Sequence, residues 1–269
     1  MSNDYGLLQD LKVLWRSGAL TFVLARRDVA ARYAGSAGGV LWAYVPPLLT
    51  VACYFLVFDV VFGMRLGDKA PVERVGTYLI VGMLPWMAFC DALSRAATSL
   101  VDAGGLLQKN ALPPVVFPAR SVLASAAVFA PLMLALVPAY LPWHHFSTAL
   151  LALPALVVLQ WLLCFVLGYL VAIFTAAMRD AAHLLGLALS LGVFLSPVLF
   201  PVALFPETWR WVLWINPMTG PILGYQSVLL KGEWPPAAVW MALLLWMGVA
   251  ATLLEVAVRR SREQLVDWL

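Results

Sequence analysis

The chain has 269 residues, of which 63% are hydrophobic and only 12% charged, and its mean hydropathy is +0.90. A soluble domain carries roughly 45–50% apolar and about 25% charged residues, so one soluble core could not hide this many apolar side chains. The composition indicates a polytopic membrane protein and excludes a disulfide scaffold, a disordered protein and a soluble enzyme. The small net charge of +3 does not indicate a nucleic-acid partner.

Long apolar stretches predict six membrane-spanning helices. A helix needs roughly 20 apolar residues to cross about 30 Å of hydrocarbon, and charged residues mark where such stretches end. The segment between Arg120 and Arg179 has no charge, and the break at residues 141–145 divides it into two helices. We expect the spans near residues 38–61, 76–97, 119–141, 149–177, 182–205 and 236–257.

The first 33 residues predict an amphipathic helix at the membrane interface rather than a further span. Leu7, Leu11 and Leu14 recur at helical spacing, opposite charged residues such as Asp10. A helix of this kind lies in the interface with its apolar face toward the lipid. No small-residue cleavage site follows an apolar run, so we do not expect a secretory signal.

The distribution of lysine and arginine predicts that both termini are cytoplasmic. Cytoplasmic loops carry an excess of these residues, and this orientation places most of the 17 on the inner side. We expect one membrane domain over residues 1–269, with a six-span region at 38–257 and a cytoplasmic tail at 258–269. The basic residues left on the outer side would be Arg65, Lys69, Arg74, Arg210 and Lys231.

The sequence lacks the motifs of several enzyme and transporter classes. It has no G-x-x-x-x-G-K-[ST] loop for nucleotide phosphates and no cysteine or histidine spacing typical of a metal site. The pair His144-His145 is better explained as part of a loop. Asp59, Asp91 and Glu255 lie near predicted span ends rather than at a midplane, which counts against an ion-coupled transporter.

Two loops carry more information. Residues 106–114 predict a short helix stopped by two prolines, which would dock a cytoplasmic partner; an ordinary loop is the alternative. Residues 196–218 hold too little charge for a free loop and too many prolines for one helix. Two short helices dipping back into the outer leaflet would explain this segment, and its tryptophans also fit an interfacial belt.

Short motifs follow one another in order along nearly the whole chain. They are Arg27-Asp28, Arg32 to Ser36, Gly39 to Trp42 with Pro46, Leu84-Pro85-Trp86, Leu106 to Lys109, Phe117-Pro118, Ser196-Pro197-Val198, Asn216-Pro217-Met218 and Leu230 to Pro235. None is specific alone, but the ordered set resembles the permease subunits of type-two ABC exporters for bacterial cell-surface polysaccharides. One departure is Gln226, where such sequences often carry an arginine.

The resemblance implies an all-α subunit that works as a homodimer bound to two copies of a separate ATPase. ATP and magnesium would bind that partner, so we expect no cofactor, metal site or catalytic residue in this chain, and no nucleic-acid partner. The N-terminal helix and the loop after span 2 would contact the ATPase. The residues expected there are Arg27, Asp28, Leu106, Leu107, Gln108, Lys109 and Asn110.

The resemblance also implies a conduit lined by aromatic side chains. Aromatic faces stack on sugar C–H faces without demanding one hydroxyl pattern, whereas a ring of charges would hold an anionic polymer too tightly to release it. We favour Tyr54 and Phe58, which share a helix face at i, i+4, although simple packing would also explain the pair. The full set expected in the conduit is Trp42, Tyr54, Phe58, Trp86 and Phe89, and at an outer gate Ser196, Pro197, Phe200, Asn216, Pro217 and Tyr225.

The function expected from these features is export of a lipid-linked polysaccharide, most like O-antigen, across the bacterial inner membrane. Capsular polysaccharide and teichoic acid stay open, because aromatic side chains do not specify the sugar. A type-two ABC permease for a drug or a lipid is one alternative. A membrane-embedded acyl or glycosyl transferase is another, and His144-His145 would be its only candidate cluster.

Overall fold

The structure is a computed structural model that describes residues 6–66, 72–109, 112–140, 147–261 and 264–268. Within these ranges every regular element is a helix, apart from one isolated antiparallel bridge between Arg65 and Arg74. The expected all-α class is therefore confirmed.

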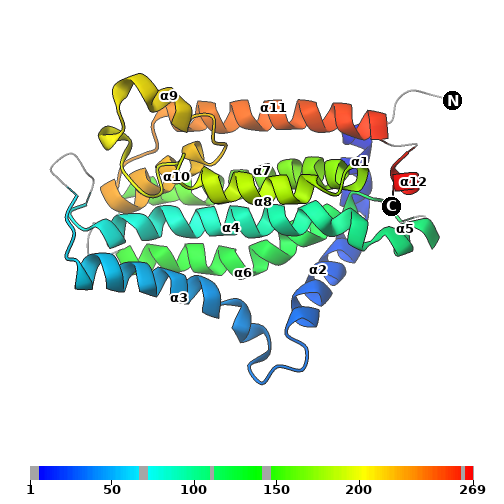
Figure 1. Cartoon of the computed structure of the whole chain (residues 1–269), viewed down its shortest axis with the longest axis horizontal. Helices are drawn as coiled ribbons and strands as arrows, with labels where there is room; N and C mark the ends of the chain where they lie inside the picture. The colour runs from blue at the N-terminus through cyan, green and yellow to red at the C-terminus, as the bar shows by residue number, and fades with distance from the viewer. Residues whose placement is uncertain (1–5, 67–71, 110–111, 141–146, 262–263, 269) are drawn as a thin grey trace.

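Within the described part of the chain, five helical segments are long and apolar enough to cross a membrane, and they form one bundle (Figure 1). The first is composite, with a 3-10 turn η1 (Gly39–Ala43), the helix α3 (Val45–Tyr54) and the π-helical turn η2 (Phe55–Val61). The others are α4 (Val75–Asp102), α6 (Val116–Tyr140), α7 (Ala152–Ala177) with the preceding turn η3 (Thr148–Leu151), and α11 (Ala237–Ser261).

Shorter helices lie at the two ends of this bundle and between α7 and α11. At one end, called here the α1 end, lie α1 (Leu7–Arg16), α5 (Gly104–Lys109) and α12 (Leu265–Trp268), and α2 (Gly18–Arg32) leads away from it (Figure 1). The opposite end, called the α9 end, carries α9 (Arg210–Leu213). The remaining elements are α8 (Ala181–Gly192), the turns η4 (Val202–Leu204) and η5 (Glu207–Trp209), α10 (Thr219–Gln226) and the π-helical η6 (Ser227–Lys231).

The fifth predicted span differs from the structure. We expected a helix over 182–205, but α8 has 12 residues and ends at Gly192, which gives about 18 Å at 1.5 Å per residue. Pro197 and Pro201 follow, and proline lacks the N–H that a helix interior needs. The part of the chain that follows α7 and precedes α11 in the sequence still passes from the α1 end toward the α9 end (Figure 1). The other five predicted spans agree with observed helices to within a few residues.

The N-terminal segment forms two helices instead of the one that we expected over residues 1–33, and residues 1–5 lie outside the described ranges. α1 ends at Arg16 and α2 begins at Gly18. α1 lies across the α1 end of the bundle (Figure 1). Its Leu7 and Leu14 pack on the bundle rather than toward lipid, and Asp10, which we expected on the charged face, is buried.

Helix α4 is the centre of the bundle. It contacts α3, α6, α7, α8 and α10, and most of its side chains are buried. Helix α7 approaches it closely at Gly168, where an added Cβ would lie 2.7 Å from the Cβ of Ala96. Small residues at such a crossing let two backbones come together, which increases the van der Waals contact between them.

Asp59 stabilises the start of α4 from another element. This carboxylate is buried and accepts hydrogen bonds from the backbone N–H groups of Gly76 and Thr77, at 2.6 and 3.0 Å, and from the Thr77 hydroxyl at 2.8 Å. The first N–H groups of a helix have no partner within the helix, and a nearby negative charge also favours the helix dipole. Asp59 therefore joins the first long segment to α4, and it is neither exposed nor paired with a cation among the described residues.

Candidate transport groove and coupling face

A groove of about 640 Å³ lies between the first long segment, α4 and α8. Tyr54 and Phe58 line it from one side, Trp86 lines it from α4, and Phe194 and Leu199 line it from the segment after α8. Three of the five predicted conduit aromatics therefore share one groove. No charged side chain lines it within the described part of the chain.

The Tyr54 and Phe58 rings are stacked, with centroids 5.9 Å apart and an interplanar angle of 9°. Phe58 belongs to the π-helical turn η2, where the backbone makes wider turns than an α-helix. Turns of this kind occur frequently at functional sites. The arrangement presents two nearly parallel rings, both half-buried, at the side of the groove.

Helix α4 contributes a stripe to the groove that the sequence analysis missed. Met83, Met87, Cys90 and Ser94 line the groove together with Trp86. Their spacing of three or four residues is the spacing that puts side chains on one helix face. That pattern is present in the sequence, but apolar residues occur on most sides of α4, and so the periodicity does not single out one face.

The other two predicted conduit aromatics lie elsewhere. Phe89 is buried with its ring 5.7 Å from Trp86, and both residues line a second, apolar cavity of about 370 Å³ between α4, α7 and α8. Trp42 is half-exposed on the turn η1, and it lines neither cavity. Trp86 and Leu189 therefore line both cavities.

The residues predicted at an outer gate are mostly buried parts of a folded connection. The Asn216 side chain donates to the carbonyl oxygens of Gly192 and Leu195 at 2.8 and 3.3 Å, and it accepts from the N–H of Met218 at 2.9 Å. One amide thus holds the end of α8 beside the start of α10. Ser196 is also buried, and its hydroxyl donates to the carbonyl of Val193.

The remaining predicted gate residues have separate positions. Pro197 is buried, and Phe200 stacks on Phe205 at 5.6 Å. Pro217 lines the second cavity. Tyr225 is buried and donates to Oε1 of Gln160 at 2.9 Å, while Nε2 of the same glutamine donates to the carbonyl of Pro85 at 3.0 Å. These contacts support packing between α4, α7 and α10.

The loop predicted to touch an ATPase forms the short helix α5 at the α1 end. Leu106 is exposed, as are Gln108 and Lys109, whereas Leu107 is 8% exposed and packs in a cluster with Val115 and Leu265. The two leucines therefore have different environments, because only Leu106 faces outward. Asn110 lies outside the described residues.

Arg27 and Asp28 lie on α2. Arg27 is exposed, and Asp28 forms an ion pair with Arg32 one turn later, at 2.9 Å. A second pair joins Asp91 to Arg95 on α4, and Asp91 also accepts a hydrogen bond from Ser125 on α6. In the ranges that the structure describes, no three histidine, cysteine, aspartate or glutamate side chains form a group that could hold a metal ion.

Comparison with known proteins places these features in a family. The profile of the family described as "ABC-2 type transporter" matches residues 19–230. The chain is 30% identical over 251 residues to the O-antigen export system permease protein RfbA of Myxococcus xanthus, covering 89% of this chain and 94% of that protein. It is 23% identical over 240 residues to a protein of the same name from Klebsiella pneumoniae, covering 86% of this chain and 85% of that one.

A third relative is the polysialic acid transport protein KpsM of Escherichia coli, 22% identical over 245 residues, which cover 88% of this chain and 91% of KpsM. The family match extends from α2 to the end of η6 and so includes the groove, α5 and the connection after α8. A permease of this family is a transport subunit and requires an ATPase subunit as its partner. This chain is a multi-pass membrane protein that belongs to the ABC-2 type transporter family, as a permease.

Proposed function

We propose that the chain is the transmembrane subunit of an exporter that moves a lipid-linked polysaccharide, most like O-antigen, across the bacterial inner membrane. The observation that carries this proposal is the uncharged aromatic groove between Tyr54, Phe58 and Trp86. The printed names of the relatives, which are O-antigen and polysialic acid transport proteins, point to the same class of substrate.

The chemistry of the groove suits a sliding polymer. A long chain of sugars needs many weak contacts, because one deep binding site would trap it. Stacked rings such as Tyr54 and Phe58 offer apolar faces to sugar C–H groups, and the lining hydroxyls of Ser94 and Ser190 can exchange hydrogen bonds with water or with sugar. None of these contacts requires one particular sugar.

A second copy of the chain would close the groove. In the most apolar stretch of the segment Gly39–Val61, only 11% of the residues are buried, and its exposed side chains include Leu48, Leu49 and Phe55. An exposed apolar surface of this kind must be in contact with lipid or with another protein surface. We propose that two copies face each other across the groove and that two ATPase subunits bind the α1 end of the dimer.

The proposed orientation places the α1 end in the cytoplasm. α1, α5 and α12 lie together there, as required if both termini are on the same side (Figure 1). The exposed Leu106, Gln108 and Lys109 of α5 would contact the ATPase, and Arg27 and Asp28 of α2 would lie at the edge of that contact. The α9 end, with α10 and η6 as re-entrant helices, would face outward and hold the exit.

A deletion strain of the source bacterium tests the substrate. Without this chain, we expect the surface polysaccharide to disappear and the lipid-linked polymer to accumulate on the cytoplasmic side. Re-expression of the wild-type chain should restore export, while its co-expression with an inactive ATPase should not. Unchanged surface polysaccharide in the deletion strain would overturn the proposal, and a simultaneous loss of drug or lipid efflux would favour those substrates instead.

A further inference from the structure

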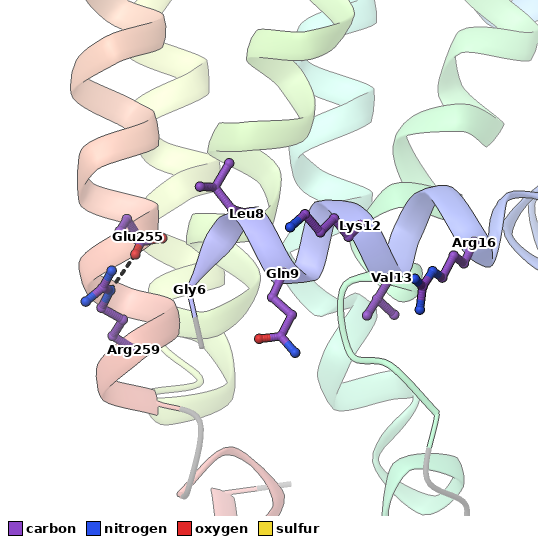
Figure 2. A pocket seen from close by; sticks show the side chains of 8 residues that line it. All are labelled: Gly6, Leu8, Gln9, Lys12, Val13, Arg16, Glu255 and Arg259. Carbon is purple, nitrogen blue, oxygen red and sulfur yellow. Dashed lines mark hydrogen bonds and ion pairs between the residues drawn. The ribbon is translucent and has the colours of Figure 1, made fainter. Parts of the chain in front are cut away.

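A further cavity, of about 640 Å³, lies at the α1 end, between α1 and the last turns of α11 (Figure 2). It is separate from the transport groove and shares no lining residue with it. Three basic side chains line it, Lys12 and Arg16 from α1 and Arg259 from α11, together with the carboxylate of Glu255. The family match over residues 19–230 does not include the residues that line this cavity.

The cavity has a firmly positioned wall. Glu255 accepts a hydrogen bond from the N–H of Leu7, which is the first residue of α1, and another from Arg259. Gly6 makes this approach possible, because a Cβ there would lie 2.2 Å from Oε1 of Glu255. On its other side α1 is held by Asp10, which accepts a hydrogen bond from the Tyr169 hydroxyl at 2.9 Å. Contacts with α7 and α11 therefore fix the position of α1.

The charges in the cavity do not cancel. Glu255 is paired with Arg259, so this pair contributes no net charge. Lys12 and Arg16 are exposed, and neither has an ion-pair partner among the residues that the structure describes. They lie one turn apart on α1, and Figure 2 shows both beside the same cavity. The excess of two positive charges fits an anion.

Apolar side chains flank the basic ones. Leu8 is 76% exposed and lines the cavity, and in Figure 2 it projects toward the body of the bundle, away from Gln9 and Val13. Trp15, on the same side of α1 as Leu8, is 89% exposed. An anion that binds here would thus have apolar protein surface immediately beside it, on the membrane side.

We propose that this cavity binds the phosphate headgroup of an anionic membrane phospholipid, with its acyl chains against Leu8. Basic pockets between helices on the cytoplasmic side of a membrane attract anionic headgroups, and an interfacial helix gains affinity both from buried apolar area and from basic residues. The bound lipid would hold α1 at the interface, next to the proposed ATPase contact. This inference rests on the proposed cytoplasmic placement of the α1 end, but not on which substrate the transporter exports.

Native mass spectrometry of the chain, purified with its ATPase and titrated with phosphatidylglycerol, tests the proposal. Each basic side chain near the phosphate contributes about fivefold to affinity, so the double variant Lys12→Gln/Arg16→Gln should bind about 30-fold more weakly. The matched control Arg179→Gln removes an exposed cation at the end of α7, outside the cavity, and should bind as the wild type does.

Two further measurements distinguish a lipid headgroup from a free phosphate compound. Leu8→Gln should weaken phosphatidylglycerol binding although it removes no charge, and glycerol phosphate, which has the same headgroup without acyl chains, should not compete. Competition by glycerol phosphate with no effect of Leu8→Gln would show a site for a free phosphate compound and overturn the lipid assignment. Equal lipid binding by the wild type and the double variant would overturn the site itself.

Discussion

The side-chain amide of Gln226 on α10 donates a hydrogen bond to the carbonyl oxygen of Pro197 at 2.7 Å. The hydroxyl of Tyr78 on α4 donates to the same oxygen at 2.8 Å, and both donors are buried. One carbonyl thus joins the segment after α8 to two helices. Gln226 stands where the resemblance led us to expect an arginine, and a neutral donor is sufficient for the contact that the structure shows.

Removing both donors to Pro197 should cost more than the sum of the single changes. Tyr78→Phe and Gln226→Leu each remove one hydrogen bond and should each lower the free energy of unfolding by about 1 kcal/mol. The double variant leaves a buried carbonyl without a side-chain donor and should lose about 3 kcal/mol, because the two donors share one acceptor. Thermal unfolding in detergent measures all three variants, with Gln108→Leu on the exposed face of α5 as the control.

The outcome that would contradict this prediction is strict additivity. If the double variant loses only the sum of the two single losses, the two hydrogen bonds act independently of each other, and Pro197 is not the point that joins them.

The aromatic rings of the groove should support export by stacking on the polymer rather than by occupying apolar volume. Tyr54→Ala and Phe58→Ala should slow export about tenfold while the dimer still assembles and the ATPase stays active, since one lost stacking contact is worth about 1–1.5 kcal/mol. Leucine at either position should give a similar defect, because it restores apolar volume without a ring. Export of labelled polymer in inside-out vesicles measures the rate.

The control for the groove variants is Phe174→Leu, which changes an exposed ring on α7 that does not line the groove. It should leave the export rate unchanged. Normal export by the leucine variants of Tyr54 and Phe58 would show that these two rings serve packing, and the stacking proposal would be wrong.

The two leucines of α5 should respond differently to the same substitution. Leu107→Asp puts a charge into a buried cluster without a partner and should lower the free energy of unfolding by more than about 3 kcal/mol. Leu106→Asp changes an exposed side chain and should leave folding intact, yet it should abolish the coupling of ATP hydrolysis to export. Fluorescence-detected size exclusion reports folding, and transport per ATP hydrolysed reports coupling.

Leu106→Met is the matched control at α5, because it keeps an apolar side chain at this position. It should couple ATP hydrolysis to export as well as the wild type does. If Leu106→Asp exports normally at equal protein level, α5 does not transmit the motion of the ATPase. If Leu107→Asp is as stable as the wild type, the described burial of that side chain is refuted.

The crossing of α4 and α7 should tolerate no added methyl group at Gly168. Gly168→Ala would bring two Cβ atoms to 2.7 Å, so the helices must separate, and overpacking of this kind costs about 1–3 kcal/mol. Gly248→Ala in α11 is the control, since a Cβ there meets nothing within 4 Å. The midpoint of thermal unfolding should fall for the first variant only, and equal midpoints would contradict the close approach.

Cysteine labelling tests the proposed orientation. After replacement of the native cysteines, a single cysteine at Glu207 near α9 should react with an impermeant reagent added to intact spheroplasts, and one at Lys109 in α5 should react only after lysis. Reaction at 109 without reaction at 207 would reverse the orientation.

Several features of the fold follow from the sequence because they depend on hydrophobicity along the chain. The positions of five long helices and the all-α class could be predicted, since about 20 apolar residues without charge have few other stable conformations in a bilayer. The helix within residues 106–109 could also be predicted, because prolines at 113 and 114 limit how far it extends. The pairing of Tyr54 with Phe58 followed from helical spacing alone.

Other features depend on residues that are distant in the sequence, and only the tertiary structure decided them. Helix α8 ends at Gly192, and an amide 24 residues further along holds that end, which no local pattern reveals. Trp86 lines the groove while Trp42 does not, although both are aromatic residues in predicted spans, because Trp86 lies on α4, which contacts both the first long segment and α8. The cavity beside Lys12 exists because Glu255 meets the start of α1 across nearly the whole length of the chain.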